Sequence, residues 1–193
     1  MSTNFRPALV LFLLLSLICT VFYPAVITLI GRIVFPTQAE GSLLIHNGQL
    51  VGSSLIGQSF SANHYFWGRP SATTPIPNNA ASSNGSNLGP TNPEKIAIIK
   101  TRIAALKAAD PQNTLLIPID LVTASASGLD PDISLAAAFY QVSRIARERQ
   151  MTINELHALI IQYTQPRYGG IFGEPRVNVL RLNLALDEIK LSN

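Results

Sequence analysis

The strongest constraint on this chain is a run of 25 residues without a charge, from Pro7 to Gly31, in which Leu, Ile, Val, Phe and Ala dominate. A helix of that length would be roughly 37 Å long, enough to cross a hydrocarbon core of about 30 Å with some tilt. Only a helix satisfies its own backbone polar groups in lipid. We therefore predict a single transmembrane helix over residues 7–31.

Pro24 lies inside this span and removes one helical hydrogen bond, which frees the carbonyl of Thr20. Since a lone helix in lipid has no need of a proline, we interpret Pro24 as a candidate contact with a neighbouring helix. A cleaved secretory signal is the alternative, with Thr37-Gln38-Ala39 as the cleavage site. Such signals have an apolar core of only about 7–15 residues, much shorter than this run.

The charges that flank the span favour one orientation. The N-terminal flank carries the α-amine and Arg6, whereas the other flank carries Arg32 and then no Lys or Arg until Arg69. Because positive charge accumulates on the cytoplasmic side, we predict a short cytoplasmic tail over residues 1–6. Residues 32–193 are then expected to form one extracytoplasmic domain.

The composition of that domain argues against several classes of function. From Ile33 onward it holds 12 of the 14 Lys and Arg residues against 11 Asp and Glu, with both signs spread out, so it has no basic stripe typical of nucleic-acid binding. Cys19, the one cysteine, lies in the apolar run, and the domain therefore has no disulfides. His46, His64 and His157 are isolated from one another in the sequence, and we predict no metal site.

The domain begins with a predicted hairpin. Asn47-Gly48 between the runs 42–46 and 49–51 is typical of a β-hairpin, because both turn residues need a positive φ. A further strand is predicted over residues 114–122, near a sheet edge because Pro118 cannot donate a ladder hydrogen bond.

Helices are predicted later in the chain from caps and apolar periodicity. Their starting signals are Asn92, Asp130, Thr152 with Glu155, and a position at about Arg176. The first of them should end at Asp110, and the second should bury Leu135 and Phe139 and expose Arg144. A hairpin first and helices later indicate an α+β fold with a small sheet and about four helices.

The segment between hairpin and helices contains adjacent aromatic residues and a long loop. Tyr65, Phe66 and Trp67 cannot all point into one core from a strand, so at least one should face elsewhere. Either they anchor the core and leave one ring on the surface, or they anchor an interface with another protein. Residues 71–92, rich in Pro, Asn, Ser and Gly, are predicted to form an irregular loop packed on the surface.

No nucleophile with an adjacent base is evident, and neither a GxSxG nor an SxxK motif is present. Ser125 and Ser127 lie in a small-residue turn beside Gly128, where serine is ordinary. Asp130 and Asp132 are interpreted as capping carboxylates. We therefore predict a subunit or adaptor with no catalytic, cofactor-binding or metal-binding residues, the alternative being a membrane-tethered extracytoplasmic serine hydrolase that uses one of the two serines.

Five blocks of sequence, in order along the chain, resemble the KdpC family, the C subunit of the bacterial high-affinity potassium-transporting P-type ATPase. The blocks contain the motifs GSSLIGQ, YFWGRPSA, SNLGPTNP, DLVTASASGLDP and GEPRVNVL, and with the N-terminal helix they span nearly the whole chain. Two positions differ from the family pattern: Asp132 stands where His is expected, and Gln165 stands where Glu is expected.

The resemblance implies a non-catalytic accessory subunit of a pump in the bacterial inner membrane, with its domain in the periplasm. The implied partners are a channel-like potassium-selecting subunit, KdpA, an ATP-hydrolysing P-type subunit, KdpB, and a small single-helix subunit, KdpF. The complex would use ATP, magnesium and potassium. The C subunit would serve assembly and act as a catalytic chaperone that raises the ATP affinity of the catalytic subunit. Since an external domain does not meet cytoplasmic ATP, we expect any such effect to pass through the membrane helix.

The candidate contacts with partners lie in the membrane helix and on the domain. They are Pro24, Tyr65, Phe66, Trp67, Arg69, Asp130, Asp132, Glu174 and Arg176. If the domain covers the mouth of the channel, the acidic residues Asp130, Asp132 and Glu174 are also candidates for shaping potassium entry.

Overall fold

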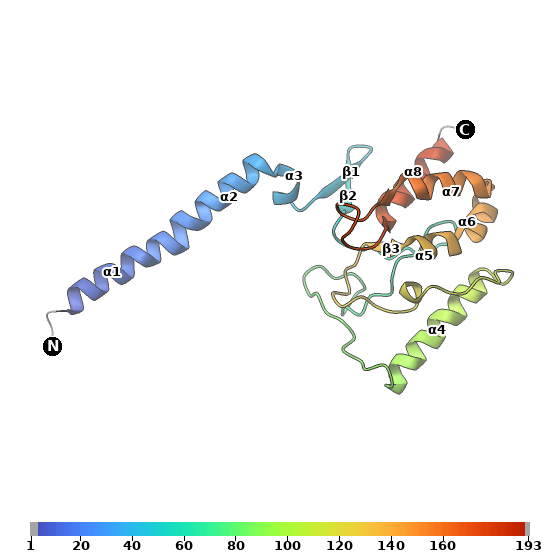
Figure 1. Ribbon diagram of the computed structural model, residues 1–193, viewed down its shortest axis with the longest axis horizontal. Helices are drawn as coiled ribbons and strands as arrows, with labels where there is room; N and C mark the ends of the chain where they lie inside the picture. Colours follow the sequence, from blue (N-terminus) through green and yellow to red (C-terminus); the bar gives the residue numbers. More distant parts are fainter. Residues whose placement is uncertain (1–3, 192–193) are drawn as a thin grey trace.

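In the computed structural model, which describes residues 4–191, one continuous helix runs from Phe5 to Val34 and projects away from the rest of the chain (Figure 1). It comprises α1 (Phe5–Leu17), a π-helical turn (Ile18–Phe22) and α2 (Tyr23–Val34). Its apolar residues are not buried against the domain. The predicted membrane-length helix is confirmed, and it is the one such helix within residues 4–191.

The π-helical turn ends at Phe22, two residues before Pro24. Tyr23 donates its N–H to the carbonyl of Ile18, five residues back, and Thr20 Oγ1 donates to the carbonyl of Ser16 at 2.6 Å. A wide turn of this kind re-satisfies backbone groups near a proline that cannot donate. Pro24 therefore widens one turn without ending the helix.

The predicted hairpin follows a short helix, α3 (Pro36–Ala39). β1 (Leu43–His46) pairs antiparallel with β2 (Gln49–Ser53). The turn residues Asn47 and Gly48 have φ values of +50° and +76°, so the hairpin and its turn chemistry are confirmed.

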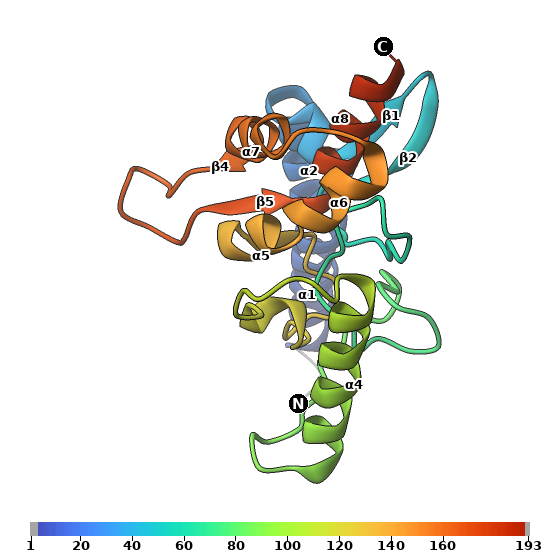
Figure 2. The same cartoon turned by 90° about the vertical axis from the view of Figure 1, so that its right-hand side faces the viewer.

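The rest of the domain places a three-stranded antiparallel sheet, in the order β3–β5–β4, among helices (Figures 1 and 2). In chain order the elements are α4 (Pro93–Ala109), the 3₁₀ turn η2 (Ile119–Leu121), β3 (Asp132–Ser134), α5 (Leu135–Tyr140), α6 (Val142–Arg149), α7 (Ile153–Gln162), β4 (Thr164–Gln165), β5 (Arg176–Asn178) and α8 (Val179–Leu191). The α+β class is confirmed. Within the described residues the domain has two small sheets and helices α4 to α8, of which α5 and α6 are separated by Gln141 alone.

The core lies where α5 to α8 pack against this sheet. Ile133 on β3 and Val177 on β5 are buried, as are Leu156 on α7 and Leu182 on α8. Burying one such side chain contributes about 1.5–3 kcal/mol. Since the only cysteine lies in the membrane-length helix, this apolar packing stabilises the domain without a disulfide.

The strand predicted over residues 114–122 is wrong. The segment crosses the surface as irregular chain, with Leu116 94% and Ile119 71% exposed, and ends in η2, where Leu121 is buried. An apolar run is not enough for a strand, because a strand also needs a partner backbone and Pro118 has no N–H to offer one.

Two predicted helix starts are also wrong, because strands occupy those positions. Residues 132–134 pair with residues 176–178, so the helix expected from Asp130 begins at Leu135 and the one expected at about Arg176 begins at Val179. Ser134 replaces Asp130 as the cap and accepts the N–H of Ala137 at 3.1 Å. Sheet pairing thus overrides two local capping signals.

The helix starts at Asn92 and Thr152 are confirmed. Asn92 Oδ1 accepts the N–H of Glu94 at 2.8 Å, and α4 ends before Asp110 as predicted. Thr152 and Glu155 form a complete capping box.

The predicted loop over residues 71–92 has no helix or strand and packs on the turn at residues 125–129. Asn84 donates its N–H to Ser127 O at 3.0 Å, and Ser71 Oγ donates to Gly128 O at 2.6 Å. Gly128 has a φ of +67°, and a Cβ on it would lie 2.4 Å from Asn84 O, so a side chain there would push the loop away.

Candidate functional site

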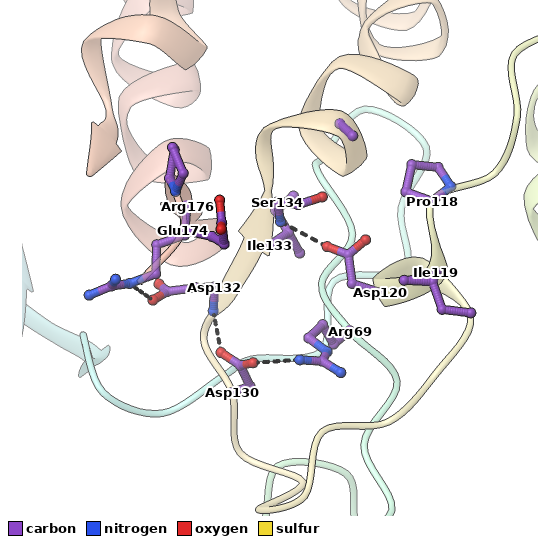
Figure 3. A pocket seen from close by; sticks show the side chains of 12 residues that line it. Arg69, Pro118, Ile119, Asp120, Asp130, Asp132, Ile133, Ser134, Glu174 and Arg176 are labelled. Carbon is purple, nitrogen blue, oxygen red and sulfur yellow. Dashed lines mark hydrogen bonds and ion pairs between the residues drawn. The ribbon is translucent and has the colours of Figure 1, made fainter. Parts of the chain in front are cut away.

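A cleft of about 560 Å³ brings together all five charged residues that we predicted as partner contacts (Figure 3). Its charged lining residues are Arg69, Asp120, Asp130, Asp132, Glu174 and Arg176. Its apolar lining residues are Pro118, Ile119, Ile133, Ala136 and Pro175. The sequence prediction missed Asp120 and Ile119, because it placed them inside a strand.

Two ion pairs join charged residues that line the cleft (Figure 3). Arg69 Nη1 lies 2.9 Å from Asp130 Oδ2, and Arg176 Nε lies 2.8 Å from Asp132 Oδ2. The second oxygen of Asp130 accepts the N–H of Asp132 at 3.0 Å, and that of Asp132 accepts a hydrogen bond from Asn178 at 3.2 Å. Burial nevertheless raises the pKa of the Asp132 carboxyl above its ordinary value, and the bond from Asn178 and the charge of Arg176 offset that shift only in part.

Replacing Asp132 by asparagine is expected to change how stability depends on pH. A carboxyl whose pKa is raised by folding binds its proton more readily in the folded state. Its contribution to the free energy of unfolding therefore falls as the pH rises from the pKa of the unfolded state through the pKa of the folded state. From about pH 3 to about pH 7, the free energy of unfolding of Asp132→Asn should therefore shift upward relative to wild type. Urea unfolding followed by the fluorescence of Trp67, the one tryptophan, measures this.

The matched control is Glu148→Gln, which removes a carboxylate from the exposed face of α6. A difference between Asp132→Asn and wild type that stays constant with pH, or moves in favour of wild type, would contradict the prediction.

The other two carboxylates of the cleft differ in their partners. Asp120 Oδ2 accepts the N–H of Ser134 at 2.8 Å, and within the described residues no cation pairs with Asp120. Glu174 pairs through both oxygens with Arg167, at 2.8 and 2.7 Å, on the exposed rim. With four acidic and two basic lining residues, the cleft carries more negative than positive charge.

Asp132 and Gln165, the two positions expected above to depart from the family pattern, both lie beside Arg176. Gln165 on β4 is in register with Arg176 on β5, while Asp132 on the other side forms its ion pair. Arg176 therefore receives its counter-charge from position 132, and position 165 presents only an amide.

The adjacent aromatic residues lie mainly inside the domain. Phe66 and Trp67 are buried, which fits the core-anchor alternative, and Tyr65 is partly buried and donates its hydroxyl to Asp187 Oδ2 at 2.8 Å. Asp187 also pairs with Arg149 at 2.7 Å. These three rings therefore present little free surface.

The backbone of Phe66 and Trp67 is held by two buried side-chain amides that the sequence prediction missed. Asn183 on α8 accepts the N–H of Phe66 at 2.9 Å and donates to its carbonyl at 3.0 Å. Gln141 binds the N–H and carbonyl of Trp67 in the same way, at 2.8 and 3.1 Å. A polar residue beside an apolar helical stripe is the only signal in the sequence for either amide.

The prediction that Arg144 is exposed is wrong. The residue is 2% exposed, its guanidinium lies 4.5 Å from the centre of the Trp67 ring, and Nη2 donates to Gln141 at 2.7 Å. Burial lowers the pKa of this guanidinium to about 10, so it stays charged at neutral pH. Its partners across the chain compensate for burying it.

The membrane-length helix has a groove of its own beside Pro24. The groove has a volume of about 350 Å³ and is lined by Ala25, Thr28, Leu29 and Arg32 together with the proline. Small residues allow close approach of a second helix in a membrane. Pro24 thus lies beside a groove that is lined in part by small residues.

Comparisons with known proteins cover the helix and the domain together. A family model described as KdpC, the K+-transporting ATPase c chain, matches residues 5–188. The potassium-transporting ATPase KdpC subunits of Janthinobacterium sp. (strain Marseille) and Herminiimonas arsenicoxydans are each 64% identical over 188 residues, which is 97% of this chain and 100% and 99% of those proteins. The KdpC subunit of Methylibium petroleiphilum is 60% identical over 187 residues, 97% of this chain and 98% of that protein.

Proposed function

This chain belongs to the KdpC family of potassium-transporting ATPase subunits, and from that premise we propose that it is a non-catalytic accessory subunit of an ATP-driven potassium uptake pump. Its proposed partners are KdpA, which selects potassium, KdpB, which hydrolyses ATP, and the small subunit KdpF. The match to KdpC subunits over 97% of the chain carries the proposal.

Two surfaces support a role within a complex. The membrane-length helix offers a groove at Pro24, and the domain offers a charged cleft with apolar walls. The hydroxyls of the two candidate nucleophiles hold a turn: Ser125 Oγ accepts the N–H of Gly128 at 2.9 Å, and Ser127 Oγ accepts that of Leu129 at 3.2 Å. Nothing in these contacts favours the alternative of a serine hydrolase.

We further propose that the helix spans the inner membrane once, with residues 1–6 in the cytoplasm and the domain in the periplasm. Arg6 before the span and the lack of any Lys or Arg between Arg32 and Arg69 support this orientation. In this arrangement the domain does not meet cytoplasmic ATP. A raised ATP affinity of KdpB, the proposed chaperone effect, would then be transmitted by the membrane helix.

The first test is purification of the full chain through a C-terminal tag, in mild detergent, from potassium-starved cells. Recovery of a channel-like protein and of potassium-stimulated ATPase activity is expected, because a subunit that is packed on its partners stays with them. An untagged strain is the control. Recovery of the chain alone, without ATPase activity, would contradict the proposed function and favour the tethered hydrolase.

A further inference from the structure

We propose that the cleft binds an extramembrane segment of a partner subunit in which an apolar side chain lies next to a lysine or arginine. This inference rests on the proposed function, since it assigns to one face of the domain the contact that a pump subunit requires. Three observations carry it: the apolar flanks of the cleft, a preformed projecting hairpin, and an excess of negative charge.

Exposed apolar residues flank the cleft on both sides. One side is formed by Leu115 and Leu116, which precede η2, and by Ile119, its first residue. Leu116 is almost fully exposed. On the other side the connection from β4 to β5 carries Tyr168, Ile171 and Phe172, which are 85%, 75% and 70% exposed. We call the cleft with these six residues the cleft face.

The two flanks lie on one side of the domain. Figure 2 shows the β4–β5 connection extending far from the body of the domain, with the yellow segment that holds η2 on the same side. The cleft joins them, because Ile119 lines one wall and Glu174 to Arg176 line the other. Large exposed apolar areas with a polar rim are typical of protein contacts in otherwise soluble domains.

The projecting connection is held in shape by its own contacts. Tyr168 and Phe172 exchange two backbone hydrogen bonds, at 2.9 and 3.0 Å, around Gly169 and Gly170, both of which have a positive φ. The Arg167–Glu174 pair closes its base at 2.7 Å. Because the apolar side chains are presented by a preformed turn, binding them costs less conformational entropy than ordering a loose loop would.

The charge of the cleft selects among possible occupants. Arg69 and Arg176 are already paired with Asp130 and Asp132, which leaves Asp120 as a carboxylate without a cationic partner in the described part of the chain. Its position on the wall suits a lysine or arginine that enters next to an apolar side chain. A second copy of the same face, or an anionic lipid headgroup, would bring like charge against like charge. A basic and apolar protein segment is therefore the occupant that fits.

Site-specific crosslinking identifies the occupant. A photoreactive phenylalanine analogue is placed at Ile119 or at Phe172 in the full chain, expressed with the whole complex, and the linked peptides are sequenced by mass spectrometry. We expect both positions to link to an extramembrane segment of another subunit that contains a lysine or arginine within a few residues of the linked site. Ile76, a 60% exposed apolar residue outside the cleft face, is the matched control.

The charge is tested separately with Asp120→Asn, which keeps an oxygen to accept the N–H of Ser134 and removes only the negative charge. We expect roughly tenfold less ATPase to remain on the tagged chain after a salt wash, as for loss of a central interface contact. The control Glu148→Gln, on the exposed face of α6, should retain the wild-type amount.

Crosslinks only to lipid or to a second copy, no more crosslinking at Ile119 and Phe172 than at Ile76, or full retention by Asp120→Asn would each overturn the inference. These results differ from failure of the proposed function, in which the wild-type chain recovers no ATPase.

Discussion

Replacing Asn183 by leucine is expected to lower the free energy of unfolding of the domain by about 3 kcal/mol. The two side chains have the same branching and number of heavy atoms, but leucine is bulkier and offers no partner to the buried N–H and carbonyl of Phe66, which Asn183 binds at 2.9 and 3.0 Å. An unsatisfied buried polar group costs about 1–3 kcal/mol. The change is a large fraction of the marginal stability of a folded domain, so assembly of the complex should fall with it.

Chemical unfolding of the detergent-solubilised chain, followed by the fluorescence of buried Trp67, measures the effect. Asn154→Leu is the matched control, because Asn154 is exposed on α7, and it should change the free energy of unfolding by less than about 0.5 kcal/mol. Equal unfolding midpoints for Asn183→Leu and wild type would show that the two hydrogen bonds from Asn183 to the backbone of Phe66 contribute nothing to stability.

Filling the groove of the membrane-length helix is expected to reduce assembly of the pump about tenfold, which corresponds to about 1.4 kcal/mol. The double substitution Ala25→Leu and Thr28→Leu keeps the span apolar and helical but occupies the space beside Pro24. In a membrane, association depends on close packing at small residues, so added bulk there weakens it. In the complex that still forms, we also expect a higher KM for ATP, because the proposed coupling to the catalytic subunit passes through this helix.

Potassium-stimulated ATPase recovered on the tagged chain, at several ATP concentrations, measures both effects. The control is Ile27→Leu with Ile30→Leu, which changes residues on the opposite face of the same helix and keeps the span apolar. Unchanged assembly and unchanged KM for the groove variant would rule out this face as a helix contact. Equal losses for both variants would point instead to general perturbation of the span.

The elements that were predicted correctly depend on signals a few residues apart. The Asn47-Gly48 turn, the Asn92 cap and the Thr152–Glu155 capping box all satisfy backbone groups of their immediate neighbours. Such contacts cost little chain entropy to form, which is why local patterns report them reliably.

The elements that were predicted wrongly depend on partners far along the chain. Asp130 is a good cap by its sequence, yet residues 132–134 form a strand because residues 176–178 lie beside them. The run at 114–122 is apolar enough for a strand, yet the described residues offer its backbone no strand to pair with. Tertiary pairing overrides local propensity in both cases.

By itself, the sequence determined the membrane-length helix, the hairpin, the α+β class and, through its five motif blocks, the family, because these follow from composition and from short-range pattern. Only the tertiary structure decided that the charged candidates share one cleft and that Phe66 and Trp67 are enclosed by Asn183 and Gln141. The partners in the Arg176–Asp132 pair and the Asn183–Phe66 bond are 44 and 117 positions apart. Their meeting depends on sheet register and helix packing across the whole domain, which no local pattern encodes.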